Sequence, residues 1–181
     1  MVLKIQEAKT ETKINPRRTA YMGVFTALVY VTTSISIPMP PPLGVWHMGN
    51  LVSFLSAILC GPVVGAFACG VGATLFDVWN PLWGSSFSVY APASLIIRGS
   101  MGYVLGLIAY KRENIRKYAT IAVVAGHLWK NIGYFIYDYL LYGSAAFFDL
   151  TSLSIKSIFE IILTIATLEA VRRKIGRNYL S

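Results

Sequence analysis

Acidic residues are scarce in this sequence, and charged residues of any sign are few. Only 8 of the 181 residues are Asp or Glu, and all charged residues together make up 13% of the chain. Hydrophobic residues make up 55%. About a quarter of an average soluble domain is charged, so this composition excludes an ordinary soluble globular protein.

Sequence motifs for catalysis and for metal binding are also missing. The chain has two cysteines, Cys60 and Cys69, both in or beside apolar stretches, and no paired-cysteine metal motif. It has no His-Glu-x-x-His, no Gly-x-Ser-x-Gly and no Gly-x-x-x-x-Gly-Lys-Ser/Thr run. We therefore expect no metal site, no cofactor and no direct ATP binding, and an enzyme has no support in the sequence.

Six apolar stretches, separated by very short loops, fill the chain between residues 19 and 171. A membrane-spanning helix needs about 20 apolar residues. The sequence predicts an all-α membrane protein with a single domain over 19–171. Because proline does not continue a helix, a tight hairpin is predicted at Cys60-Gly61-Pro62. The predicted spans are Thr19–Ile37, Met48–Cys60, Val63–Trp79, Val89–Tyr110, Tyr118–Leu141 and Leu150–Val171.

The net charge of +8 is unevenly distributed between the loops. Lys and Arg cluster before the first span, between the fourth and fifth, and after the sixth, whereas segments 38–46, 80–88 and 142–149 contain none. Loops rich in Lys and Arg stay in the cytoplasm. This distribution predicts a multi-pass protein of the cell membrane with both termini inside, and it favours the bilayer over nucleic acid as the partner. Residues 1–18 form a cytoplasmic leader and 172–181 a basic tail.

Small residues recur every four positions in the first span, at Thr19, Gly23 and Ala27. This spacing lets two helices approach closely in a lipid environment. The stripe fits either a partner helix or ordinary internal packing. The proline-rich segment Ile37–Trp46 follows on the outer side, and Trp46 at its end fits either an interfacial anchor or part of a lid over a pocket.

Charged side chains inside the membrane are costly and need partners, cavities or ligands. The fourth span contributes Arg98 and the sixth contributes Lys156 and Glu160. At 100° per residue, the polar residues of the fifth span share an arc of about 100°. These features predict a polar cleft that opens outward between the fifth and sixth spans, with Tyr134, Tyr137 and Phe159 on its walls, and a small heteroaromatic ligand. The residues on the arc are His127, Lys130, Asn131, Tyr134 and Asp138.

Three other interpretations of the same residues stay open. Lys156 and Glu160 are one turn apart and can pair with each other. Arg98 can cap carbonyl groups or pair with Asp77, and His127 can serve in packing alone. Carboxylates and histidines in a membrane also suit a proton relay.

An ordered set of motifs resembles the substrate-binding S components of energy-coupling factor (ECF) vitamin transporters, in their riboflavin-type branch. The resemblance covers nearly everything after Arg18, with a basic residue and Gly at Arg98-Gly99 among its features. The other matching residues are Gly49-Asn50, Gly61-Pro-Val-Val-Gly65, Gly70-Val-Gly72, Asp77, Tyr90-Ala-Pro92, Gly133-Tyr134-Phe135, Asp138 and Gly143.

The resemblance implies six helices, an outward-facing vitamin pocket and a lid that ends at Trp46. It implies that Thr19, Gly23 and Ala27 dock a transmembrane T subunit, which couples to two ATPases. Trp46, His47 and Asn50 then join the substrate-binding residues Arg98, Lys130, Asn131, Tyr134, Asp138, Lys156 and Glu160.

The substrate and two other kinds of function remain open. Candidates for the substrate are riboflavin, a thiamine precursor and another small cofactor precursor. The alternative functions are a stand-alone proton-coupled importer, and a membrane-embedded enzyme or assembly factor.

Overall fold

The computed structural model describes residues 15–38, 45–82 and 84–175. Six α-helices make up most of these described residues, which confirms the predicted all-α class, and each predicted span coincides with one helix. The helices are α2 (Pro16–Ser34), α3 (Gly49–Cys60), α4 (Pro62–Val78), α5 (Ala91–Ala109), α6 (Ile115–Tyr142) and α7 (Ala146–Ile175). Short 3-10 turns precede α5 and α7, η1 at Ser88–Tyr90 and η2 at Gly143–Ala145.

The first helix begins earlier than the sequence predicts. The Asn15 side chain accepts a hydrogen bond from the backbone N–H of Arg17 at 3.1 Å, and Pro16 occupies the first turn. An Asn cap followed by proline is a favourable helix start. Part of the predicted leader is therefore helical, while its residues 1–14 lie outside the described part of the chain.

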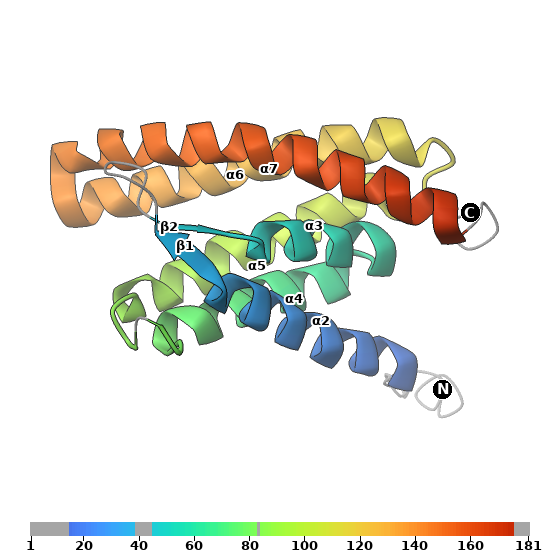
Figure 1. Ribbon diagram of the computed structural model, residues 1–181, viewed down its shortest axis with the longest axis horizontal. Coiled ribbons are helices and arrows are strands. Elements are labelled where there is room, and N and C mark those ends of the chain that lie inside the picture. The colour runs from blue at the N-terminus through green and yellow to red at the C-terminus, as the bar shows by residue number, and fades with distance from the viewer. Residues whose placement is uncertain (1–14, 39–44, 83, 176–181) are drawn as a thin grey trace, which may run out of the picture.

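The helices alternate in direction, so that the C-terminal ends of α2, α4 and α6 and the N-terminal ends of α3, α5 and α7 all point to the same side of the bundle (Figure 1). That side is at the left of the view, where α6 and α7 reach furthest, whereas α2 ends and α3 begins nearer the middle. The first turn of α2 and the last turn of α7 lie at the opposite end. Long helices α6 and α7 run side by side.

The hairpin between α3 and α4 is confirmed at the predicted position. Gly61 separates the two helices with a φ of 94°, a backbone conformation that favours glycine. Small residues then bring α4 against its neighbours: a Cβ on Gly65 would lie 2.7 Å from the Cα of Ala57 on α3 and 2.8 Å from the carbonyl oxygen of Gly102 on α5. The Gly-x-x-x-Gly spacings in α4 and α5 thus serve internal packing.

Two short strands, which the sequence did not predict, form a hairpin between α2 and α3. Strand β1 (Ser36–Pro38) pairs antiparallel with β2 (Val45–His47), with Ile37 opposite Trp46. The remaining prolines of the predicted stiff segment lie among residues 39–44, outside the described residues. The hairpin places His47 next to the start of α3.

Polar and apolar side chains are distributed the opposite way from a soluble protein. Arg98, Lys130 and Glu160 are buried, whereas Leu140, Ile96 and Phe148 are 78%, 70% and 69% exposed. An apolar core of buried residues from α3, α5 and α6 fills the end of the bundle away from the strands. The helices therefore turn their charges inward and their large apolar side chains outward.

Length and composition single out one helical stretch among the described residues as a candidate membrane span. It is Ser88–Ala109, with a mean hydropathy of 1.4, and α3 and α4 are apolar but shorter. The prediction of six spans with cytoplasmic termini remains a prediction.

Candidate functional site

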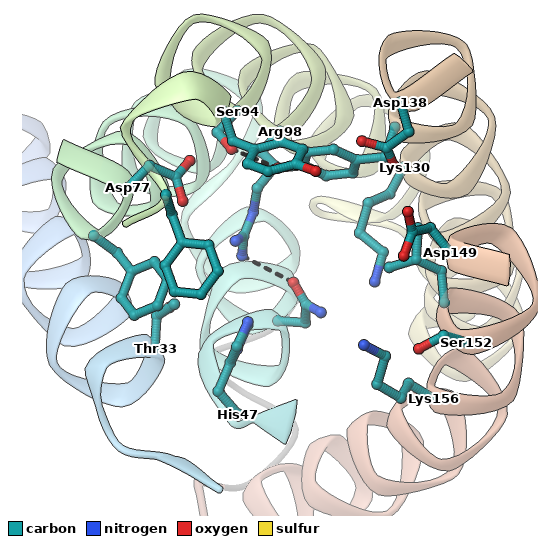
Figure 2. A pocket seen from close by; sticks show the side chains of 16 residues that line it. Thr33, His47, Asp77, Ser94, Arg98, Lys130, Asp138, Asp149, Ser152 and Lys156 are labelled. Carbon is teal, nitrogen blue, oxygen red and sulfur yellow. Dashed lines mark hydrogen bonds between the residues drawn. The ribbon is translucent and has the colours of Figure 1, made fainter. Parts of the chain in front are cut away.

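A cavity of about 290 Å³ lies at the end of the bundle where the strands are found, since His47 of β2 is among its lining residues. All six helices contribute to its walls, so it is wider than the predicted cleft between the fifth and sixth spans. The sequence argument missed this because it located the site by intramembrane charge, and α2 and α3 contribute uncharged side chains. Asn50 represents α3 among the lining residues. Figure 2 labels residues from the other five helices: Thr33 from α2, Asp77 from α4, Arg98 from α5, Lys130 from α6 and Lys156 from α7.

Most of the predicted binding residues line this cavity. Helical periodicity identified the members on α6 correctly, since they repeat every four residues on one face. The predicted residues that line it are His47, Asn50, Arg98, Lys130, Tyr134, Asp138 and Lys156.

The other three predicted residues lie elsewhere. The Asn131 amide and the Ser157 hydroxyl are hydrogen-bonded to each other at 3.2–3.3 Å between α6 and α7. Glu160 is buried behind the cavity wall, and Trp46 sits in β2 without lining the cavity. Whether any of the three contacts a ligand stays a prediction.

A hydrogen-bonded chain of buried side chains ties four helices together beneath the cavity. Arg98 Nη2 donates to Asn50 Oδ1 at 2.8 Å and to Ser53 Oγ at 3.3 Å. Asn50 Nδ2 in turn donates to Glu160 Oε2 at 2.8 Å. Lys130 Nζ approaches the same carboxylate oxygen at 3.3 Å. We call this chain of Arg98, Asn50, Glu160 and Lys130 the buried network.

The buried network differs from the pairs considered on sequence alone. Glu160 accepts from Asn50 on α3 and from Lys130 on α6, two partners that helical spacing along α7 does not predict. Arg98 bonds to Asn50 and Ser53, whereas Asp77 lies near the C-terminal end of α4. His127 fits the packing interpretation, because it lies edge-on to Phe54 at 4.6 Å between ring centroids. Its Nδ1 is 3.6 Å from Glu160 Oε2.

His47 is held as a neutral ring at the cavity wall. Its Nδ1 accepts a hydrogen bond from the backbone N–H of Gly49 at 3.2 Å, so the ring hydrogen is on Nε2. Burial, together with the charges of Arg98, Lys130 and Lys156, lowers the pKa of His47 to about 3. A side chain on Gly49 would collide with the Thr33 hydroxyl, so glycine is required for this close approach of α2 and α3.

Aromatic side chains cover one part of the cavity wall, but they are mostly not the predicted ones. Tyr134 lines the cavity, and its hydroxyl is 2.6 Å from Ser94 Oγ. Tyr137 instead donates to the Val89 carbonyl at 2.6 Å, and Phe159 is 65% exposed. The prediction of these two as cavity walls is wrong, because neither is among the lining residues: Tyr137 turns to the α4–α5 connection and Phe159 faces outward.

The aromatic residues that sequence reasoning missed come from the segment around the α4–α5 connection. Phe76 and Phe87 stack with ring centroids 5.6 Å apart, and Tyr90 packs 6.4 Å from Tyr134. Tyr90 and Asp77 belonged to the motifs that carry the family resemblance, and those motifs were the available signal. Asp149 and Ser152 also line the cavity, two turns and one turn before Lys156 on the same face of α7.

The predicted docking stripe on α2 faces away from the rest of the chain. Thr19, Gly23 and Ala27 are all exposed. A Cβ on Gly23 would meet no atom within 4 Å, unlike the glycines of α4 and α5. Within the described residues this surface therefore has no intramolecular partner.

Metal ligands do not cluster in the described part of the chain, where no group of three His, Cys, Asp or Glu side chains could hold an ion. The polar groups of the cavity instead offer hydrogen-bond donors and acceptors around a small space. This arrangement can bind a small polar aromatic molecule.

Comparisons with known proteins give a family and two relatives. A family model described as "ECF-type riboflavin transporter, S component" matches residues 13–172. An uncharacterized protein from Pyrococcus woesei is 33% identical over 118 residues, which cover 65% of this chain and 74% of that protein. The thiamine precursor transporter HmpT of Lactococcus lactis subsp. cremoris (strain MG1363) is 30% identical over 131 residues, or 71% of each chain.

Proposed function

Because this chain belongs to the S components of ECF-type riboflavin transporters, we propose that its cavity binds a small vitamin or vitamin precursor with high affinity for uptake. S components are the membrane-embedded, vitamin-binding subunits of these transporters and not enzymes. The observation that carries the proposal is the polar, aromatic-walled cavity at one end of the helical bundle. Seven of the residues proposed to bind substrate line it.

The inverted distribution of polarity supports a place inside the bilayer. Buried charges joined by hydrogen bonds, and large apolar side chains turned outward, are what a lipid environment requires. We infer six membrane spans over residues 19–171, with the leader 1–18 and the tail 172–181 in the cytoplasm. The Lys and Arg residues of the α5–α6 connection and of both chain ends support this orientation.

The partners proposed for the chain are a transmembrane T subunit and two ATPases. The exposed stripe of Thr19, Gly23 and Ala27 is the proposed docking surface for the T subunit. Its support is the small-residue spacing together with the open space around Gly23.

The cavity volume bears on which vitamin is bound. About 290 Å³ is at the small end of the range for ligand pockets. This size favours a vitamin precursor with one or two rings, and a relative that transports a thiamine precursor agrees with that preference. Riboflavin itself remains a candidate because of the family match.

A stand-alone proton-coupled importer is the second candidate function. The specific observation in its favour is that His127 and Lys130 both lie within 3.6 Å of the buried Glu160 carboxylate. It predicts uptake driven by a pH gradient in vesicles that contain this protein alone, and loss of that uptake in Glu160→Gln. Uptake that requires the T subunit and ATPases speaks against it.

Mass spectrometry of small molecules released from the gently purified, detergent-solubilised protein tests the first proposal. We expect near-stoichiometric recovery of one heteroaromatic compound. The variant Leu153→Trp, which fills the cavity from α7, should release far less, whereas Leu140→Trp on the exposed face of α6 should match the wild type. An empty wild-type protein that also gives no thermal shift with a panel of vitamins would refute the proposal.

A further inference from the structure

The charged groups that line the cavity are sorted by depth along the helices. Asp77 is the penultimate residue of α4, Asp138 lies four residues before the end of α6, and Asp149 is the fourth residue of α7. These three carboxylates therefore stand at the helix ends that meet at the strand end of the bundle. We call them the acidic rim.

The cations of the cavity lie deeper. Lys130 precedes Asp138 by eight residues on α6, and Lys156 follows Asp149 by seven on α7. At 1.5 Å per residue, each lysine is about 10–12 Å further along its helix than the carboxylate. Arg98 on α5 is at the same level as Lys130 on α6. Ser100, two residues after Arg98, accepts a hydrogen bond from Trp129, which directly precedes Lys130. We call Arg98, Lys130 and Lys156 the basic floor.

Contacts between α5 and α6 and with the segment before α5 follow the same order of depth. Near the rim, Tyr137 Oη donates to the Val89 carbonyl at 2.6 Å. One turn deeper, the Tyr134 hydroxyl meets Ser94. Figure 2 shows Lys130 and Lys156 pointing into the same open space, with Arg98 across from them. Tyr134 stands between Lys130 and Asp138, one turn from each.

The basic floor brings three cations close together around one deeply buried carboxylate. That carboxylate is Glu160, which lies behind the wall and accepts from Asn50 and Lys130. Lys156 is attracted by Glu160 and, from the rim, by Asp149. Buried charge of one sign is unfavourable unless a counter-charge reaches it. An anion bound on the floor would supply that counter-charge.

Hydrogen-bond donors on the floor and nearby remain for such an anion. Arg98 is 5% exposed, and its Nε has no hydrogen-bond partner among the described residues. His47 presents its Nε2 hydrogen on the cavity wall, because Nδ1 is already occupied by the Gly49 N–H. At the rim the orphaned atoms are acceptors, Asp77 Oδ2 and Asp138 Oδ1.

We propose that the ligand of this cavity is a heteroaromatic molecule with an oxyanion, a phosphate monoester or a carboxylate, that binds on the basic floor. The inference rests on the proposed function and specifies the substrate class of the same site. The aromatic body lies at the level of Tyr134. The acidic rim repels the anionic end of the ligand and accepts hydrogen bonds from N–H groups at the ligand's opposite end. The anionic end of the ligand therefore points inward, toward the basic floor.

Matched ligand pairs test the proposal with the full-length protein in detergent, by isothermal titration calorimetry. The probes are riboflavin with flavin mononucleotide, a hydroxymethylpyrimidine with its monophosphate, and nicotinamide with nicotinate. Since hydrogen bonds to charged groups are stronger than neutral ones, the anionic member of at least one pair should bind about 10-fold or more tightly. A preference for the anionic member that is confined to the nicotinamide–nicotinate pair would identify a carboxylate as the anionic group of the ligand. A preference in the flavin or pyrimidine pair would identify a phosphate.

Variants of Lys156 assign the preference to the floor. Lys156→Gln should reduce binding of the anionic member about 10-fold or more, and should reduce binding of the neutral member by a much smaller factor. Lys156→Arg should retain the preference. Lys117→Gln is the matched control, because Lys117 is exposed at the opposite end of α6.

Two different failures can be told apart. Equal or tighter binding of the neutral member in every pair that binds would overturn the proposal and leave the vitamin-binding function standing. The absence of binding by every probe, together with an empty protein by mass spectrometry, would overturn the function and the proposal with it. The comparison of anionic with neutral ligands uses the wild-type protein alone. It therefore stays decisive even if Lys156→Gln fails to fold.

Discussion

Asn50 is uncharged, yet its amide connects two charged side chains. The carbonyl oxygen accepts from Arg98 and the amide nitrogen donates to Glu160, both at 2.8 Å. The amide dipole is therefore aligned with its positive end toward the carboxylate. A carboxylate at this position would place two like charges in contact, so the residue type follows from its neighbours.

Replacing Asn50 should be costly for stability. Asn50→Leu removes one partner from each of two buried charged groups, and we expect a loss of about 2–3 kcal/mol. The measurement is thermal unfolding of the purified protein in detergent. Asn131→Leu is the control, since it breaks only the neutral contact with Ser157 and should cost about 1 kcal/mol. Equal destabilisation by the two variants would contradict the role of the buried network.

His47 should not make binding depend on pH in the physiological range. The ordinary pKa of histidine is about 6.5, but that of His47 is lowered to about 3. The ring in the folded protein thus stays neutral between pH 8 and 5. Its contribution to the free energy of unfolding is complete above pH 6.5, the pKa in the unfolded chain, and is lost as the pH falls toward 3.

Calorimetric titrations across pH 8 to 5 check this expectation. The profile of ligand affinity against pH for His47→Gln should have the same shape as that of the wild type, although the absolute affinity can differ because the ring is lost. An inflection near pH 6.5 that disappears in His47→Gln would contradict the prediction.

Single residues of the site could be predicted only in part. The polar face of α6 was found because the residues repeat on one side of a helix, which needs no tertiary information. The partner of Glu160 could not be found this way. Lys156 is its neighbour by helical spacing, whereas Asn50 is 110 residues away in sequence and is brought close only by the packing of α3 against α7.

At the scale of the elements, glycines decide how closely α3, α4 and α5 approach. Gly65→Ala would push a methyl group against Ala57 and the Gly102 carbonyl, and we expect a loss of about 1–3 kcal/mol. Gly99→Ala is the control on α5. A Cβ there lies 3.6 Å or more from every neighbour, so it should be neutral or stabilise slightly, since alanine favours helix.

Thermal unfolding of both variants measures this difference. A Gly65→Ala protein as stable as the wild type would mean that the helices can separate without loss. The buried face of α4 would then not set the spacing of the bundle.

Helices were predicted well and strands were not, for a physical reason. Apolar runs with few breaks mark each helix, and Gly61-Pro62 marks the hairpin between α3 and α4. Strands β1 and β2 have three residues each, too few for an alternating pattern to stand out.

At the scale of the whole molecule, binding and transport should be separable by mutation. Gly23→Leu or Ala27→Leu adds bulk on the exposed stripe of α2, far from the cavity, so both variants should retain ligand affinity. We expect them to abolish ATP-dependent uptake in vesicles that also contain the T subunit and ATPases, because the partner helix can no longer approach.

The matched control is Ala170→Leu on the exposed side of α7, which should retain uptake. Normal uptake by Gly23→Leu would show that the stripe is not the docking surface. Loss of ligand affinity by Gly23→Leu would show that the change disturbs the fold instead.

The buried network also determines how the molecule can move. It links α3, α5, α6 and α7 through charges that would each lose a partner if one helix swung away, at several kcal/mol per ion in a low-dielectric interior. Helix α2 is locked to α4 where Gly72 meets Val29. Bending the bundle is therefore harder than tilting the whole protein as a single rigid body. A force applied to α2 by another protein would rotate the cavity together with α2 and leave a bound ligand in place.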